Sequence, residues 1–213
     1  MTSCDYRDSA IMIAHTSYKT FHAALQGVLP AANAFRGVLY RACDPIHANT
    51  RDLLTGEGRR RQGGRWNAPD GAATVYLAQN VEGAMAESLG LATHFGFDPA
   101  SRLPLTLVAV DAALKVVIDL TDAALRKSLA VTLAAMTGCD WRNQNAAGHE
   151  AFTQALGRAA FDLGAHGIIV PSAAKRTFKN LNIFPANLGS TCHLEILRAG
   201  RLPPPGATRS GSS

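Results

Sequence analysis

The sequence predicts an α+β fold built around one main domain. After an initial helix, the expected elements follow the order β, β, α, β, β, α, α, β, β, β, which is not the strict βαβα alternation of a doubly wound sheet. The chain has 213 residues and is 47% hydrophobic, which is enough for one substantial core. We therefore expect a helical extension over 1–36, a main domain over 37–199 and a disordered tail, rich in proline, glycine and serine, over 200–213.

Hydrophobic spacing and turn residues place the elements of the N-terminal half. Phe21, Leu25 and Val28 recur at helical spacing, and Asn80 fits the N-cap of a second helix. Between two strands lies a Gly- and Arg-rich loop of about 28 residues. Loops of this length without regular structure are uncommon in compact domains unless they have a function. In chain order we expect a helix over 17–27, a strand over 37–43, this loop to residue 71, a strand over 73–78 and a helix over 80–94.

The C-terminal half contains β-rich and Ala-rich runs. A turn near Asp111 is expected to separate two strands, and Thr121 is expected to cap the helix that follows them. In chain order we expect strands over 103–110 and 115–120, helices over 122–136 and 149–163, and late strands over 167–171, 181–184 and 192–197.

Several classes of protein are excluded by what the sequence lacks. No run approaches the roughly eighteen apolar residues that a membrane span needs, and the start of the chain lacks the basic-then-apolar order of a secretory signal. The four cysteines are scattered, with no CxxC pair and no histidine cluster, so we expect no metal site and a reducing, cytoplasmic setting. The motifs of serine hydrolases, P-loop NTPases, zinc proteases and Rossmann dehydrogenases are also missing.

Positive charge is concentrated in one loop. The formal net charge is +5, and much of the excess lies in Arg59, Arg60, Arg61 and Arg65. This concentration predicts either a phosphate-binding loop or an RNA contact, and composition does not separate the two.

Two arginines are candidates for binding an anion. Arg41 lies inside the apolar strand LYRAC, where a guanidinium faces either water or a cleft that holds an anion. Pairing with a carboxylate at a sheet edge is the alternative for this residue. Arg65 lies in GGRWN, where Gly63 and Gly64 permit backbone conformations closed to other residues and Trp66 offers a flat aromatic surface, although such a sequence also makes ordinary loops.

A tyrosine and a glutamate follow at regular distances. Tyr76 should point to the opposite face of its strand from its two neighbours in VYLA, either as a core tyrosine or as the wall of a site. Glu87 shares a helical stripe with small and apolar residues, so its carboxylate should be partly buried. A buried carboxylate is either paired, here with one of the two arginines, or used in binding or catalysis.

Polar residues near the late strands complete the candidate set. Ser172 in VPSA follows a strand end and a proline, a usual place for a hydroxyl that contacts a ligand and equally for a helix cap. Asn180 and Asn182 in KNLNIFP either hydrogen-bond a ligand or stabilise a turn.

Taken together, these segments resemble the RES domain, a family named for its Arg, Glu and Ser and known as the toxin half of Xre-RES toxin–antitoxin pairs. The resemblance covers about residues 37–197 and rests on the order of Tyr40-Arg41, GGRWN, VYLA, the Glu87 helix, VPSA and NLNIFP. From Arg65 to Tyr76 and from Tyr76 to Glu87 the spacing is eleven residues each. The long stretch between Glu87 and the VPSA segment departs from the pattern, and we interpret it as an insertion that alters access to the cleft.

The resemblance implies an ADP-ribosyltransferase-like fold, a mixed sheet flanked by helices, and roles for the candidate residues. Glu87 would stabilise an oxocarbenium-like ribose, and Arg41 and Arg65 would bind a pyrophosphate or an inorganic phosphate. Tyr76 would stack on the nicotinamide ring or wall the pocket, and Ser172 would hydrogen-bond a phosphate or ribose oxygen. Arg41, Glu87 and Tyr76 form the expected catalytic set. The expected binding set is Arg65, Ser172, Tyr40, Trp66 and Asn182.

The function that the resemblance implies is that of an NAD+-degrading toxin, whose catalytic domain spans 37–199 and cleaves the nicotinamide–ribose bond by phosphorolysis or hydrolysis. NAD+ would be its substrate, inorganic phosphate a co-substrate, and no cofactor is expected. Transfer of ADP-ribose to a protein and RNA binding by a regulatory protein stay open as alternatives. We expect an Xre-family antitoxin as partner, contact with nucleic acid only through that antitoxin, and no membrane. The sequence does not choose between a monomer and a homo-oligomer.

Overall fold

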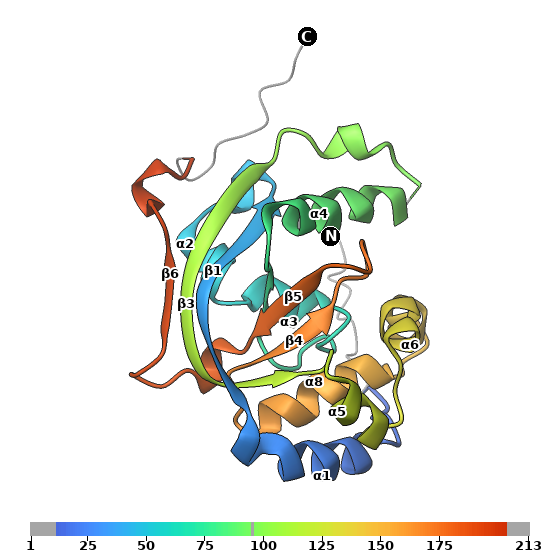
Figure 1. Ribbon diagram of the computed structural model, residues 1–213. Coiled ribbons are helices and arrows are strands. Elements are labelled where there is room, and N and C mark those ends of the chain that lie inside the picture. The colour runs from blue at the N-terminus through green and yellow to red at the C-terminus, as the bar shows by residue number, and fades with distance from the viewer. Residues whose placement is uncertain (1–11, 95, 204–213) are drawn as a thin grey trace, which may run out of the picture.

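The computed structural model describes residues 12–94 and 96–203 (Figure 1). Its centre is a six-stranded mixed sheet in the order β1-β2-β5-β4-β3-β6. β1 also pairs with β3, so the first five strands in this order form a closed ring of paired strands. The strands are β1 (Asn33–Cys43), β2 (Val75–Ala78), β3 (Thr106–Asp119), β4 (Gly167–Pro171), β5 (Lys179–Ile183) and β6 (His193–Ile196).

Helices flank this sheet, which confirms the predicted α+β class. α4 packs across the ends of β1 and β2, while α1 and α8 lie side by side against the opposite part of the molecule (Figure 1). Among the described residues, no helix is both long and apolar enough to cross a membrane. The helices are α1 (Tyr18–Val28), α2 (Thr50–Leu54), α3 (Glu57–Gln62), α4 (Val81–His94), α5 (Ala123–Ser128), α6 (Leu133–Gly138), α7 (Trp141–Ala146) and α8 (Phe152–Asp162).

Most of the expected elements form near their predicted bounds. The predicted helices over 17–27 and 80–94 correspond to α1 and α4, and the side chain of Asn80 accepts a hydrogen bond from the Gly83 amide at 2.6 Å, as an N-cap should. The long loop carries the short helices α2 and α3. Of the tail predicted over 200–213, residues 204–213 lie outside the described part of the chain.

Two predictions about the middle of the chain were wrong. The expected turn near Asp111 is absent, because this residue lies within the 14-residue strand β3 and pairs with β1 on one side and β6 on the other. The single helix expected over 122–136 is two helices, because Ala130 takes a left-handed conformation with φ of 53° that ends α5. Thr132 then caps α6 by accepting a hydrogen bond from the Ala135 amide.

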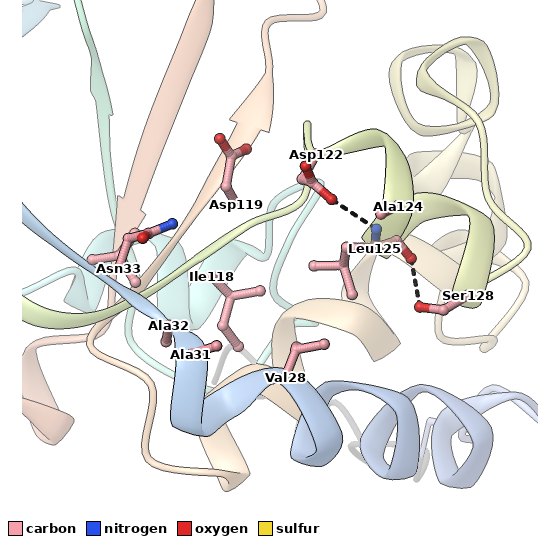
Figure 2. A pocket seen from close by; sticks show the side chains of 11 residues that line it. Val28, Ala31, Ala32, Asn33, Ile118, Asp119, Asp122, Ala124, Leu125 and Ser128 are labelled. Carbon is pink, nitrogen blue, oxygen red and sulfur yellow. Dashed lines mark hydrogen bonds between the residues drawn. The ribbon is translucent and has the colours of Figure 1, made fainter.

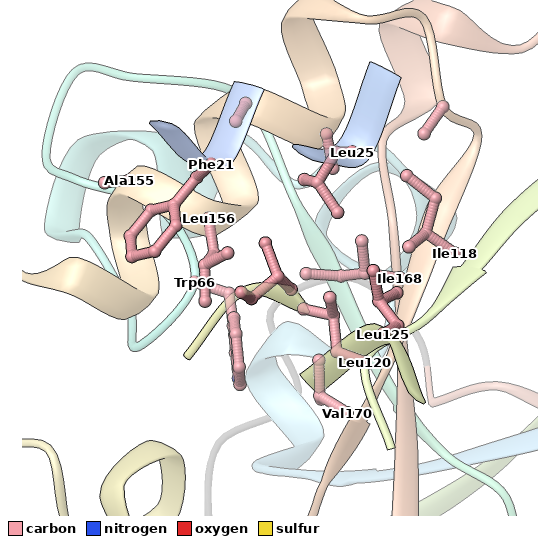
Figure 3. Packing of buried hydrophobic residues seen from close by; sticks show 14 of the residues in the cluster. Phe21, Leu25, Trp66, Ile118, Leu120, Leu125, Ala155, Leu156, Ile168 and Val170 are labelled. Carbon is pink, nitrogen blue, oxygen red and sulfur yellow. The ribbon is translucent and has the colours of Figure 1, made fainter. Parts of the chain in front are cut away.

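Two hydrophobic clusters stabilise the fold on opposite faces of the sheet. One contains Leu39, Val75 and Leu77 with alternate residues of β3 and β5. The other joins α1 and α8 to Ile168 and Val170 of β4 (Figure 3). The helix predicted in the N-terminal extension therefore belongs to the main core. The second cluster lies on the same face of the sheet as the candidate active site.

A close backbone contact fixes α8 against the GGRWN loop. A Cβ atom on Gly157 would collide with the carbonyl oxygen of Trp66. We expect Gly157→Ala to lower the free energy of unfolding by about 3 kcal/mol, because backbone cannot yield as a flexible side chain does. Gly27→Ala in α1 is the matched control, since nothing lies within 4 Å of a Cβ there and alanine favours helix. Chemical denaturation of both variants would test this contact, and equal stability would refute it.

Candidate active site

Glu87 is held by two hydrogen bonds to the same carboxylate oxygen. The Ser172 hydroxyl donates to Oε1 at 2.6 Å, and the Asn180 side-chain amide donates to Oε1 at 2.7 Å. Ser172 is fully buried, and its Oγ accepts hydrogen bonds from the amides of Ala174 and Lys175, both at 3.2 Å. Because those two amides occupy its lone pairs, the hydroxyl hydrogen is directed at Glu87. The VPSA turn therefore orients the carboxylate.

This arrangement leaves acceptor atoms in the site. No hydrogen bond from a described residue reaches the second carboxylate oxygen of Glu87, Oε2. The side-chain oxygen of Asn180, Oδ1, is buried and also lacks a hydrogen-bond partner within the described chain. A half-buried carboxylate with one oxygen fixed and the other without a hydrogen-bond partner can accept ribose hydroxyls or face a developing positive charge.

The pairing of β1, β2 and β5 places three further polar or aromatic side chains, those of Asn182, Tyr76 and Tyr40, on the same face of the sheet. Asn182 follows Asn180 by two residues and lies opposite Tyr76, while Ala78 lies opposite both Asn180 and Tyr40. Val75 and Leu77 point into the cluster on the other face, which confirms the predicted orientation of Tyr76. Asn182 is fully buried, and neither of its side-chain amide atoms has a hydrogen-bond partner among the described residues.

Tyr76 ties the GGRWN loop to the sheet. Its hydroxyl donates to Asn67 Oδ1 at 2.7 Å and accepts the Trp66 amide hydrogen at 3.0 Å. A Cβ atom on Gly64 would meet this hydroxyl at 2.5 Å, so the loop can approach only with glycine at that position. Burial raises the pKa of Tyr76 to about 12, although the positive charges of Arg59 and Arg65 oppose the shift. The phenol is therefore neutral at physiological pH.

We expect Tyr76→Phe to destabilise the fold by about 1–3 kcal/mol, because it leaves the Trp66 amide and the Asn67 side chain without their partner. The effect should depend on pH. Since the pKa of the folded state is raised, the hydroxyl contributes its full stability below pH 10 and loses it as pH rises toward about 12. Urea unfolding between pH 7 and 12 would therefore show a smaller alkaline loss of stability in Tyr76→Phe than in the wild type. Parallel curves for the two proteins would contradict this account.

Arg65 is fixed beside this group. Its Nη1 donates to the carbonyls of Met136 at 3.1 Å and Cys139 at 2.7 Å, both near the end of α6. Burial lowers the pKa of Arg65, and the negative charge of Glu87 is among those that oppose the shift. No ion pair within 4 Å joins Glu87 to either predicted arginine in the described residues. An arginine stays protonated in proteins, so this guanidinium is charged. Both of its described hydrogen bonds use Nη1, which leaves Nε and Nη2 for another acceptor.

Arg41 is not brought to Glu87, although both belong to the catalytic set expected from the sequence. It pairs with Val108 of β3. Because side chains alternate along a strand, Arg41 points to the same face as Leu39, and Tyr40 points to the other face, where Glu87 lies. Its Nη1 donates weakly to the carbonyls of Asp52 and Leu53, at 3.4 and 3.5 Å. Burial lowers the pKa of Arg41. The described charged groups that act on this pKa do not include Glu87.

Trp66 does not offer the expected flat surface to a ligand. Its side chain is 2% exposed and packs in the cluster with Leu156 and Val170 (Figure 3). The reason is that the loop is drawn onto α8: the Gln154 side chain donates to the Gly64 carbonyl at 2.8 Å, and Gly157 admits the Trp66 backbone. The indole therefore anchors the loop and leaves Arg65 at its surface.

Sequence reasoning did not assign two residues that the structure adds to the site. Asn180, and not Asn182, donates to Glu87. Both stood out in the sequence, and only the hydrogen bond from Asn180 to Glu87 of α4 distinguishes them. Arg59 lies with its guanidinium carbon 5.5 Å from the centre of the Tyr76 ring. Its place in the RRR run was the available signal, since one arginine in a helical run can face inward while its neighbours stay exposed.

Two of the cavities in the described structure differ in their lining. One, of about 630 Å³, is lined by Arg65 together with residues 137–143 and Ala146. The other, of about 330 Å³, lies between the end of α1, β3 and α5, and Figure 2 shows its mainly apolar wall, with Asp119 and Asp122 at one side. None of the predicted site residues lines this second cavity. In the described residues no group of three or more His, Cys, Asp or Glu side chains is placed to hold a metal ion.

Known proteins match both the sequence and the fold. The chain is 33% identical over 125 residues to "NAD(+) phosphorylase MbcT" from Mycobacterium bovis and from Mycobacterium tuberculosis, a match that covers 58% of this chain. The chain spans 62% of the length of these curated relatives. Among solved structures, the M. tuberculosis MbcT–MbcA toxin–antitoxin complex matches with a TM-score of 0.63 and 26% identity, covering 82% of this chain and 90% of the other.

The family match agrees with the site. It extends over residues 38–202 and so includes β1 from residue 38, the other five strands, the Glu87 helix and the VPSA turn. With the similarity to MbcT in sequence and fold, it shows that this chain belongs to the RES domain family.

Proposed function

We propose that this protein degrades NAD+ by cleaving the bond between nicotinamide and ribose, and that it acts as a toxin. The observation that carries the proposal is the placement of Glu87. Its carboxylate is oriented by Ser172 and Asn180, and its negative charge acts on the guanidinium of Arg65, which is itself held in place. Similarity to enzymes named NAD(+) phosphorylase favours phosphorolysis over hydrolysis.

The chemistry of the bond suits this site. Nicotinamide leaves as a neutral molecule with the bonding electron pair, so positive charge develops on the ribose. Glu87 would stabilise that charge or hold a ribose hydroxyl, and its two hydrogen bonds would keep it in place while the bond lengthens. Tyr76 is neutral and would act as a wall and a support, and not as a base.

Phosphorolysis requires an anion site as well. An oxygen of hydrogen phosphate would form a bond to the ribose carbon as the bond to nicotinamide breaks, giving ADP-ribose 1″-phosphate and nicotinamide without a proton transfer. Arg65 would hold a phosphate, either that of the dinucleotide or the incoming ion, through its remaining donors.

Product analysis tests the proposal. The purified protein would be incubated with NAD+ in the presence and absence of inorganic phosphate, and the products identified by mass spectrometry. We expect ADP-ribose 1″-phosphate and nicotinamide, formed only with phosphate. Free ADP-ribose would indicate hydrolysis, and label from NAD+ on a protein would indicate ADP-ribosylation. No loss of NAD+ under any of these conditions would refute the proposal.

A toxin of this kind needs a neutralising partner. We propose an antitoxin of the Xre family, in line with the toxin–antitoxin complex whose structure resembles this chain. Expression of this chain alone should lower cellular NAD+ and stop growth, and co-expression of an Xre-family protein encoded beside it should restore both. Growth arrest with unchanged NAD+ would contradict the proposed link between toxicity and this activity.

A further inference from the structure

The larger cavity contains an aromatic side chain and a guanidinium that the catalytic group does not use. The guanidinium carbon of Arg142 lies 4.3 Å from the centre of the Trp141 ring, and both side chains line the cavity of about 630 Å³. Both are half-buried, so part of each stays accessible. The cavity volume is within the range of ligand sites for small molecules, roughly 300–1,000 Å³.

Three positive charges surround this part of the molecule. The pKa of Arg142 is lowered by burial and by the positive charges of Arg59 and Arg65, while the Asp140 carboxylate, which also lines the cavity, opposes the shift. The three guanidinium groups outnumber this carboxylate, and a bound anion would offset the repulsion between them. A planar aromatic ring within such a cluster is the chemistry that recognises a nucleotide, through stacking on the base and contact with its phosphates.

Arg65 connects the cavity to the reaction centre. It lines the cavity and also belongs to the charges around Glu87 and Tyr76, whereas α7 contributes no described contact to the Glu87 group. A dinucleotide whose nicotinamide ribose lies at Glu87 and whose phosphates lie at Arg65 must place its other end beyond that arginine. α6 and α7 come from the stretch that departs from the family pattern in sequence.

We infer that the adenosine half of NAD+ binds in this cavity, against the Trp141–Arg142 pair. The inference rests on the proposed function, and it assigns α7 to the recognition of the half of the substrate that does not react. Binding energy from this half would position the scissile bond at Glu87.

Truncated substrates test the inference. Nicotinamide mononucleotide carries the same scissile bond as NAD+ but lacks the adenosine half. We expect Trp141→Ala to raise KM for NAD+ about tenfold, as expected for the loss of one base–aromatic stack, and to affect the mononucleotide much less. Trp141→Leu keeps apolar packing without the aromatic face and should behave like the alanine variant, while Trp141→Phe should retain most of the affinity. Phe97→Ala removes an aromatic side chain that is 65% exposed and lies outside the cavity, so KM should stay unchanged for both substrates.

A binding experiment separates this inference from the proposed function. ADP lacks the scissile bond, so its affinity for the wild type and for Trp141→Leu can be measured by calorimetry without turnover. Affinity about tenfold weaker in the variant would support the site, even if the wild type failed to consume NAD+ and the proposed function were lost. Equal ADP affinity in the two proteins, or equal losses for NAD+ and the mononucleotide, would overturn the inference.

Discussion

Replacing Glu87 with glutamine is expected to lower the rate of NAD+ loss by roughly 100- to 1,000-fold, because the variant removes the negative charge that faces the developing cation. The fold should stay intact. Glutamine is isosteric, and its carbonyl oxygen can still accept hydrogen bonds from Ser172 and Asn180. Initial rates of nicotinamide release, measured beside the thermal unfolding of each protein, would check both parts of this prediction.

Glu82→Gln is the matched control for this experiment. Glu82 is an exposed carboxylate in the first turn of the same helix, α4, so its replacement changes net charge equally without touching the site. We expect wild-type rates from this variant. A folded Glu87→Gln protein with wild-type activity would remove Glu87 from the mechanism, whatever the behaviour of Glu82→Gln.

Replacing Arg65 with lysine is expected to lower kcat/KM for NAD+ by about 10- to 100-fold, although the charge is kept. Lysine cannot hold the Met136 and Cys139 carbonyls and a phosphate together, since it lacks the planar fork of guanidinium. The loss would appear in kcat/KM measured at fixed phosphate concentration. Arg61→Lys, at an exposed position in α3, controls for a general effect of the substitution.

The same substitution at Arg41 distinguishes the two arginines. Because Arg41 faces the opposite side of the sheet and contacts carbonyls near the end of α2, we expect Arg41→Lys to change kcat/KM by less than about fivefold. If both variants lost activity equally, Arg41 would have to reach the substrate, as the catalytic set expected from the sequence requires.

The difference between these arginines shows what the sequence alone could predict. The strand around Arg41, the orientation of Tyr76 and the place of Ser172 after β4 all follow from local patterns, and the structure confirms them. Which of Tyr40 and Arg41 faces the site depends on a single register, Tyr40 opposite Ala78, and a shift of one residue would exchange them. Nothing local in the strand LYRAC sets that register.

Other parts of the site depend on packing between distant segments. Trp66 could be read as a binding surface because its burial arises only when α8, ninety residues further on, holds the loop through Gln154. The strand β3 continues through Asp111 because its flanking residues alternate into the core and both of its edges are paired there. α7 was not predicted, since its six residues carry no hydrophobic period, and yet it provides Trp141.

A structure of the Glu87→Gln variant bound to NAD+ would show directly whether this carboxylate faces the reacting ribose. We expect the carbon–nitrogen bond to nicotinamide to lie against residue 87 on the face shared by Tyr76 and Asn180, with a phosphate on the guanidinium of Arg65. A dinucleotide bound on the other face of the sheet, with its phosphates on Arg41 and its ribose away from residue 87, would refute the proposed site.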